Sequence, residues 1–163
     1  MGIDPGTAIT GYGVVESRGP ELRHIDSGAI RVPRTDTCSR LWFINDKIRD
    51  AIGRSRPDSV AVEKVFVARN IRSALTLGQA RGAVLVACGE LCESVQEYSA
   101  LEIKQAVVGR GRADKVQVQH MVRVLLGLGE TPQADTADAL ACAICHINWM
   151  RSRIRRSAAG GLA

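Results

Sequence analysis

Apolar and β-forming residues occur in short stretches, broken by turn residues, through the first third of the chain. Residues 10–17 (TGYGVVES) are rich in glycine and strand-forming residues. Residues 22–32 form a second such stretch after the turn signal Arg18-Gly19-Pro20. Together with the short segment 2–4, these stretches predict three antiparallel strands connected as a meander.

Helical and strand patterns alternate after a polar break at 33–37. Leu41, Ile44, Ile48 and Ile52 recur with a helical period, which predicts a helix over 39–52. The elements expected after it are a strand at 59–65, a helix capped by Asn70 that runs through Val86, a strand at 95–98, helices at 101–108 and about 115–126, and a last helix from about 132 to 149 or beyond.

This order of elements predicts an α/β fold, in which a mixed sheet is covered by helices. The chain has 163 residues, which suits one domain. No internal repeat or linker interrupts the pattern, so we expect a single domain over residues 1–155. The stretch 151–156 is basic and the end of the chain is rich in small residues, so we expect 156–163 to be a flexible tail.

The composition narrows the class of protein. The chain carries 22 Lys and Arg against 17 Asp and Glu, a net charge of +5, which leaves a polyanionic partner open without establishing one. It contains no secretory signal and no apolar stretch long enough for a membrane span, so we expect a cytoplasmic protein. We interpret most of its five cysteines as reduced, buried apolar residues; the alternative is a zinc site formed by Cys88, Cys92, Cys142 and Cys145.

Four carboxylates stand out by their context. Asp4 and Glu63 each end an expected strand, and Asp135 and Asp138 are spaced to share one face of a helix. Taken singly, each would more often be a helix cap or a solvated side chain. Taken together, they form a set of hard oxygen donors that suits Mg²⁺ or Mn²⁺. Two such ions can activate a water and stabilise the leaving oxygen of a phosphodiester.

Several longer motifs follow one another in a specific order. They are GIDPGT (2–7), TGYGV (10–14), EKVFVARN (63–70), SAL (73–75), GQARG (78–82), KQAVVG (104–109), KVQVQHMV (115–122) and PQADTADALA (132–141). This series resembles the RuvC family of crossover junction endodeoxyribonucleases over roughly residues 2–146. The resemblance implies a ribonuclease-H-like fold, with a mixed five-stranded sheet flanked by helices. It also implies a homodimer that resolves Holliday junctions by paired symmetric nicks in strands of like polarity, during recombination and DNA repair.

The resemblance also assigns roles to individual residues. The catalytic, metal-binding carboxylates correspond to Asp4, Glu63, Asp135 and Asp138, with two Mg²⁺ ions per subunit, or Mn²⁺ in their place. Phe66 would stack on a base at the junction centre, and Lys104 and Lys115 would lie beside the scissile phosphate. Arg69, next to these motif residues, is a reasonable backbone contact with less specific support. A further implied partner is a branch-migration complex of the RuvA–RuvB type. Gly78 and Gly82 lie four apart on one helix and are expected to pack closely against the sheet or a second subunit.

Three other functions compete with this one. GIDPGT also resembles the first phosphate loop of actin-like ATPases and sugar kinases, but that class needs a second lobe, for which the chain has no room. A non-catalytic junction-binding protein would not need the four carboxylates. A nuclease of the same fold that cuts RNA–DNA hybrids is excluded only by the family motifs.

Overall fold

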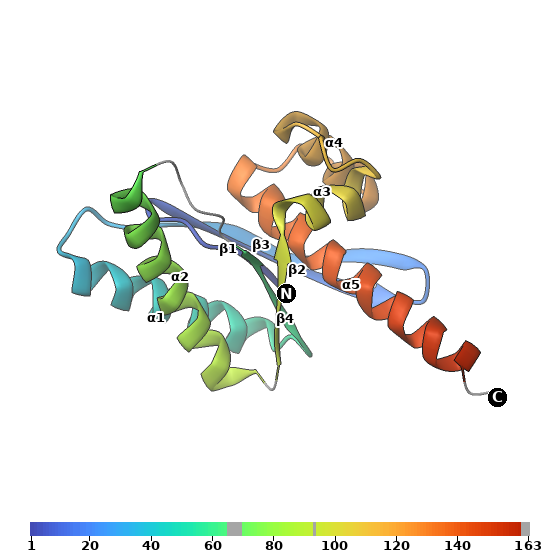
Figure 1. The fold of residues 1–163 in the computed structure, drawn as a ribbon, viewed down its shortest axis with the longest axis horizontal. Helices are drawn as coiled ribbons and strands as arrows, with labels where there is room; N and C mark the ends of the chain where they lie inside the picture. The colour runs from blue at the N-terminus through green and yellow to red at the C-terminus, as the bar shows by residue number, and fades with distance from the viewer. Residues whose placement is uncertain (65–69, 93, 161–163) are drawn as a thin grey trace.

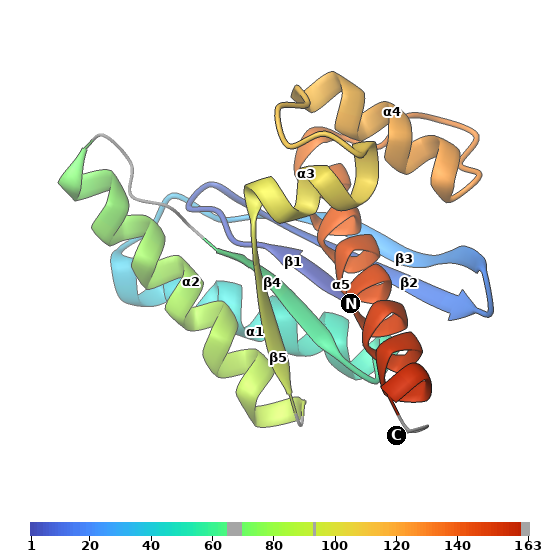
Figure 2. The same cartoon turned by 45° about the vertical axis from the view of Figure 1, so that its right-hand side comes forward.

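The computed structural model describes residues 1–64, 70–92 and 94–160. In these residues, a five-stranded sheet carries helices on both faces (Figures 1 and 2). The elements, in chain order, are β1 (Gly2–Asp4), β2 (Ile9–Arg18), β3 (Glu21–Arg31), α1 (Thr37–Ser55), β4 (Val60–Lys64), α2 (Ile71–Leu91), β5 (Val95–Ser99), α3 (Ala100–Val108), α4 (Lys115–Leu125) and α5 (Ala134–Gly160).

The sheet is mixed, with the strand order β3-β2-β1-β4-β5. The antiparallel meander of β1, β2 and β3 is confirmed, and β4 and β5 pair in parallel with β1 and with each other. Because β1 and β4 are parallel neighbours, their carboxyl ends meet at one edge of the sheet. Asp4 ends β1, and Glu63 lies next to the last residue of β4. The topology therefore brings two of the four carboxylates of interest together.

Each face of the sheet has its own apolar core. α1 and α2 cover one face, where Ile48 and Val84 are fully buried. α5 lies along the other face with α3 and α4 packed against it, and Val122, Leu140 and Ile144 are fully buried there. Residues 60–62 of β4 are buried between the two cores, as expected for a parallel strand covered on both faces.

The last helix extends well beyond Trp149, in agreement with the expectation of a helix to 149 or beyond. α5 continues past Trp149 to Gly160, because no glycine or proline interrupts residues 134–159. Arg151 also ties it to the hairpin between β2 and β3. Its Nη2 donates to the Ser17 hydroxyl at 2.9 Å and to the Gly19 carbonyl at 2.6 Å.

Glycines let the start of α5 approach the sheet closely. A Cβ on Gly2 would collide with the backbone of Ala139 and Ala143, and a Cβ on Gly11 would collide with the Asp135 carbonyl. Helix backbone therefore lies directly on β1 and β2 at these points. This contact fixes the first turns of α5 beside the strand end that carries Asp4.

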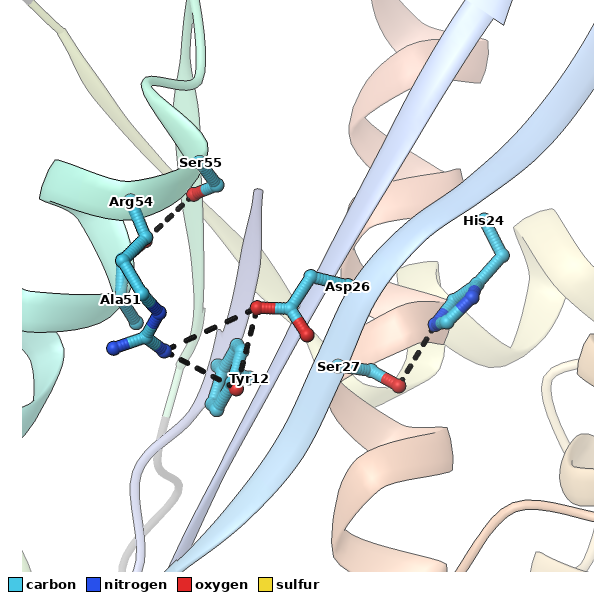
Figure 3. A network of polar contacts seen from close by, with 7 residues as sticks. All are labelled: Tyr12, His24, Asp26, Ser27, Ala51, Arg54 and Ser55. Atoms are coloured by element: carbon cyan, nitrogen blue, oxygen red, sulfur yellow. Dashed lines mark hydrogen bonds and ion pairs between the residues drawn. The ribbon is translucent and has the colours of Figure 1, made fainter.

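A polar network on the α1 side joins the helix to the antiparallel strands (Figure 3). The Tyr12 hydroxyl donates to Asp26 Oδ2 at 3.3 Å and accepts from Arg54 Nη2 at 3.5 Å. Burial, and then the charge of Asp26, raises the pKa of Tyr12, so the phenol remains a neutral donor at ordinary pH. The network anchors the last turn of α1 to β2 and β3.

The zinc alternative finds no support: no group of three or more His, Cys, Asp or Glu side chains within the described ranges is arranged to hold a metal ion, and all five cysteines are free. None of the helices in the described part of the chain combines the length and apolarity needed to cross a bilayer.

Candidate active site

A cavity of about 240 Å³ opens where the carboxyl ends of β1 and β4 meet the helical layer. Asp4 and Glu63 line it from the sheet, and Asp138 lines it from the second turn of α5. The other lining residues are Ala100, Ile103, Lys104, Lys115 and Val118. Three carboxylates and two ammonium groups that are remote in sequence thus border one space.

Asp135, the fourth carboxylate, lies one helical turn before Asp138. Its carbonyl packs on Gly11, the residue that pairs with Asp4 across β1 and β2. Its side chain is not among the groups that line the cavity, but its charge still raises the pKa of Asp4. The structure therefore brings all four predicted carboxylates within electrostatic reach of one another.

Burial and mutual repulsion disfavour ionisation of this cluster. Burial, followed by the charges of Glu63, Asp138 and Asp135, raises the pKa of Asp4 to about 8. Burial and then Asp138 raise the pKa of Glu63 to about 7. The pKa of Asp138 is also raised by burial, although Lys115 opposes that shift. Such a concentration of poorly compensated carboxylates is stabilised by a bound cation.

The two lysines come from helices that each begin with a capping box. Lys115 is the first residue of α4, after an Asp114–Gln117 capping box, and Lys104 lies in α3, which begins with a Ser99–Glu102 capping box. Lys115 Nζ lies 3.4 Å from Asp138 Oδ2, and this pairing raises the pKa of the lysine. The lysine side chain is 72% exposed, so it is free to contact a ligand as well.

The four carboxylates are the type of ligand that a hard divalent cation prefers, but their side chains are not positioned to coordinate one. All four acidic groups offer carboxylate oxygens, the ligands that Mg²⁺ and Mn²⁺ prefer. As they stand, no three of the acidic, histidine or cysteine side chains in the described segments surround a common point. Binding an ion here therefore requires side-chain rotation toward it. Burial, and then the neighbouring carboxylates, raise the pKa values of Asp4 and Glu63, and a cation bound beside them would oppose both effects.

Two residues that the sequence reading did not identify hold the loop that follows Asp4. The fully buried Thr10 hydroxyl donates to the Gly6 carbonyl at 3.1 Å and accepts from the Gly6 amide at 3.3 Å. Arg40, on α1, donates to the Thr7 carbonyl. Thr10 looked like an ordinary strand residue, and nothing in the sequence around Arg40 marks its contact.

Two predicted DNA-contacting residues, Phe66 and Arg69, lie outside the described residues. Their roles therefore stay predictions. The other two, Lys104 and Lys115, lie in the cavity beside the carboxylates.

Comparison with known protein families gives a consistent result. The model of the family described as "Crossover junction endodeoxyribonuclease RuvC" matches residues 1–146. A protein of that name from Marinobacter nauticus is 52% identical over 161 residues, which cover 99% of this chain and 92% of that protein. Another from Shewanella loihica is 51% identical over 163 residues, covering 100% of this chain and 92% of that protein.

Solved structures with a similar fold also include Holliday junction resolvases. The structure of T. thermophilus RuvC in complex with a Holliday junction substrate superposes with a TM-score of 0.85 at 38% identity, covering 93% of each chain. The yeast mitochondrial Holliday junction resolvase Ydc2 reaches a TM-score of 0.64 at 11% identity, with 91% of this chain and 78% of that one covered. At that identity, the second likeness concerns the fold alone.

Proposed function

This chain belongs to the RuvC family of crossover junction endodeoxyribonucleases, and we propose that it resolves Holliday junctions with the cavity that Asp4, Glu63 and Asp138 line. The observation that carries the proposal is the meeting of carboxylates and lysines at the carboxyl ends of β1 and β4. The reaction is hydrolysis of one phosphodiester per site. Two sites acting on strands of like polarity separate the junction into two duplexes.

The family is metal-dependent, and we assign the ions to the four carboxylates Asp4, Glu63, Asp135 and Asp138. Hard oxygen donors without His or Cys favour Mg²⁺, with Mn²⁺ as a substitute, and we propose two ions per subunit. Bound there, the ions would supply the Lewis acidity that activates water and stabilises the charge developing on the leaving oxygen. The carboxylates themselves orient the ions and repel phosphate until they are neutralised.

The lysines hold the DNA strand at the site. Lys104 and Lys115 line the same cavity as the carboxylates and carry positive charge, so a phosphate entering the cavity can contact them. Lys115 can exchange its contact with Asp138 for one with the phosphate, because its side chain is largely exposed. Phe66, outside the described residues, is proposed from the family resemblance to stack on a base. Arg69, also outside them, is proposed as a contact to the backbone because of its positive charge.

We further propose that the protein acts as a homodimer that associates through α2. On this helix, Ile71 and Leu75 are 78% and 66% exposed. Gly78 and Gly82 continue the same face, and a Cβ at either position would meet nothing within 4 Å. The sheet of the same chain therefore does not account for these two glycines. An exposed apolar stripe with small residues at its centre suits close packing against the same helix of a second copy.

Other assignments depend on the family alone. A branch-migration complex of the RuvA–RuvB type is the proposed partner in the cell. The cytoplasm is the proposed location, since chromosomal DNA is the proposed substrate.

A cleavage assay on two substrates tests the proposed function. We expect the protein to nick a synthetic four-way junction in Mg²⁺, to leave a linear duplex of the same sequence intact, and to be inactive in EDTA. Asp4→Asn, Glu63→Gln, Asp135→Asn and Asp138→Asn should each reduce nicking by about 100-fold or more while the junction is still bound. Cleavage at the wild-type rate by Asp138→Asn, or full activity in EDTA, would contradict the assignment.

A further inference from the structure

The loop between β1 and β2 directly follows Asp4, the first of the proposed metal ligands. It comprises residues 5–8 and joins two strands that pair antiparallel with each other. β1 has only three residues, and its pairing with β4 covers Gly2 and Ile3 but not Asp4. The backbone of Asp4 is therefore held by β2 on one side and by the loop that follows it.

Local geometry restricts the start of this loop. Pro5 is buried, and a proline limits the residue before it to extended conformations, so Asp4 has little backbone freedom of its own. A Cβ on Gly6 would collide with the Ile9 carbonyl, which shows that the chain turns back tightly there. The placement of Asp4 thus depends on where the turn at Gly6 is held.

Three successive carbonyls of the loop are each bonded to a different part of the fold. The Gly6 carbonyl accepts from the buried Thr10 hydroxyl at 3.1 Å, and the same hydroxyl accepts from the Gly6 amide at 3.3 Å. The Thr7 carbonyl accepts from Arg40 Nη2 on α1. The Ala8 carbonyl accepts from a backbone amide just after β3 at 2.9 Å. Two of the three bonds therefore depend on a single side chain, which a substitution can remove.

Arg40 acts on the loop from a confined position. It lies near the start of α1 and borders a crevice of about 10 Å³, which Thr76 and Gln79 line from α2. The crevice has room for no more than about one water, so the arginine has little space to move there. Arg40 forms no ion pair with a described carboxylate, and Lys115 is the cation whose charge opposes the raised pKa of Asp4. Arg40 can therefore influence Asp4 through the loop rather than through its charge.

A metal site is sensitive to small displacements of its ligands. Asp4 shares its cavity with Glu63 and Asp138, so a shift of the loop would move one carboxylate relative to the other two. Thr10 and Arg40 do not line that cavity themselves. Side chains that only orient the ligands of a metal nevertheless contribute about 10- to 100-fold to its affinity or to activity.

We propose that Thr10 and Arg40 are positioning residues for the cleavage reaction. Through two carbonyls of the loop, they hold the Asp4 carboxylate where it can share a divalent cation with the carboxylates from β4 and α5. They act through Asp4 and not on the ion or the DNA. This inference rests on the proposed function, since it requires a metal at Asp4.

Paired variants separate positioning from folding. Thr10→Val replaces the hydroxyl by a methyl group, whereas Thr10→Ser retains the hydroxyl. Arg40→Met removes the donor but keeps an unbranched side chain beside the crevice. Arg49→Met is the matched control, because Arg49 lies on the same helix and pairs with Glu90 of α2, without a contact to the loop.

The first measurement is binding of Mn²⁺ to the DNA-free protein by calorimetry, below the melting temperature of every variant. We expect Thr10→Val and Arg40→Met to weaken binding by about tenfold, and Thr10→Ser and Arg49→Met to stay within about twofold of the wild-type affinity. The second measurement is the Mg²⁺ dependence of junction cleavage. The two positioning variants should need about tenfold more Mg²⁺ for half-maximal cleavage, with unchanged affinity for the junction in EDTA. A purely structural role would lower the melting temperature without changing the metal dependence.

Wild-type metal affinity in either folded variant would overturn the role of that residue, and an equal loss in Arg49→Met would overturn both. A loss in Thr10→Ser as large as that in Thr10→Val would show that the hydroxyl is not responsible. If Thr10→Val does not fold, Arg40→Met still tests whether the loop positions Asp4. A wild-type protein that binds Mn²⁺ but cuts no four-way junction is a different outcome, because it refutes the proposed function and leaves the metal-binding comparison intact.

Discussion

At the scale of single residues, the site is defined by carboxylates that the fold does not fully compensate. Asp4, with a pKa raised to about 8, is largely protonated near neutral pH when no cation is present. Lys115 lowers the pKa of Asp138 relative to burial alone, but it does not offset the repulsion among the other carboxylates. Above neutral pH, the buried carboxylates ionise and repel one another. This repulsion lowers the stability of the folded protein and also favours binding of a cation.

The stability of the metal-free protein should accordingly fall as the pH rises. The pKa of Asp4 is higher in the folded state than its usual value of 3.8, so the folded state binds more protons between these values. The associated stability is present at low pH and is lost as the pH rises through about 8. Between pH 6 and 8.5, we expect a loss on the order of 1–3 kcal/mol after allowance for solvent screening.

Urea denaturation in EDTA at the two pH values measures this change. Asp4→Asn is the control, since it cannot titrate, and its stability should fall less over the same interval. An equal loss in the variant and the wild-type protein would show that Asp4 is not the group responsible.

A separate prediction concerns the contribution of Lys104 and Lys115 to binding of the DNA junction. In Ca²⁺, with cleavage suppressed, junction affinity should fall steeply with salt as counterions leave the DNA. Lys104→Ala or Lys115→Ala should each flatten the logarithmic slope by about one unit, because each removes one phosphate contact. Lys47→Ala is a suitable control, since Lys47 pairs with Asp46 and Asp50 on α1, outside the cavity. An unchanged slope would place the two lysines away from the backbone.

The sequence predicted the positions of the carboxylates and their supporting residues to different degrees. The three-residue spacing of Asp135 and Asp138 predicts a shared helix face, and both do lie in the first turns of α5. No spacing could show that Asp4 and Glu63 meet them, because that depends on the strand order; only the family motifs indicated it. Thr10 could not have been singled out at all, since its role depends on a buried contact with Gly6.

At the scale of secondary-structure elements, the contact between α5 and the sheet determines the geometry of the site. The helix lies on glycines of β1 and β2, so its first turns are held at backbone contact rather than at the usual side-chain separation. Asp138 reaches the cavity from this position. A side chain inserted at the contact would move the aspartates relative to Asp4.

Gly11→Ala tests this dependence. The added Cβ would collide with the Asp135 carbonyl, which belongs to the backbone and can move only with the helix. We expect a loss of about 1–3 kcal/mol in stability and a fall of about tenfold or more in cleavage rate. Gly53→Ala, in α1, is the control, since a Cβ there meets nothing within 4 Å and alanine favours a helix. Wild-type cleavage by Gly11→Ala would show that the close contact does not position the site.

Most elements could be read from the sequence, but this contact could not. The strands, the helices and the Asn70 cap of α2 follow from local patterns, and all are observed. The glycines of residues 10–14 were read only as part of a strand. Which helix packs on them depends on contacts more than 120 residues apart along the chain, about which periodicity gives no information. The continuation of α5 past Trp149 was expected without a fixed end, and the Arg151 contacts with the hairpin could not be read from the sequence because they are tertiary.

At the scale of the whole molecule, the described part of the chain contains one cavity proposed to be catalytic, but the proposed substrate needs two cuts. A single site can hydrolyse only one strand at a time. A dimer with two-fold symmetry supplies two sites in a fixed relation, which matches the symmetry of a four-way junction. In the described part of the chain, the exposed stripe of Ile71, Leu75, Gly78 and Gly82 on α2 is the surface best suited to form that interface.

Paired cutting can be distinguished from independent cutting on a plasmid that extrudes a cruciform. If both sites act within one bound lifetime, linear product forms directly; if each cut requires a new encounter, nicked circles accumulate first. We expect the wild-type protein to sediment as a dimer and to give linear product. Leu75→Lys places a charge in the apolar stripe and should give monomers that leave nicked circles, because a desolvated, unpaired charge opposes association. Val124→Lys, an equally radical change at an exposed apolar site on α4, should retain the dimer and paired cuts. A wild-type monomer that leaves persistent nicked circles would contradict the dimer. A Leu75→Lys variant that still dimerises and cuts in pairs would place the interface elsewhere.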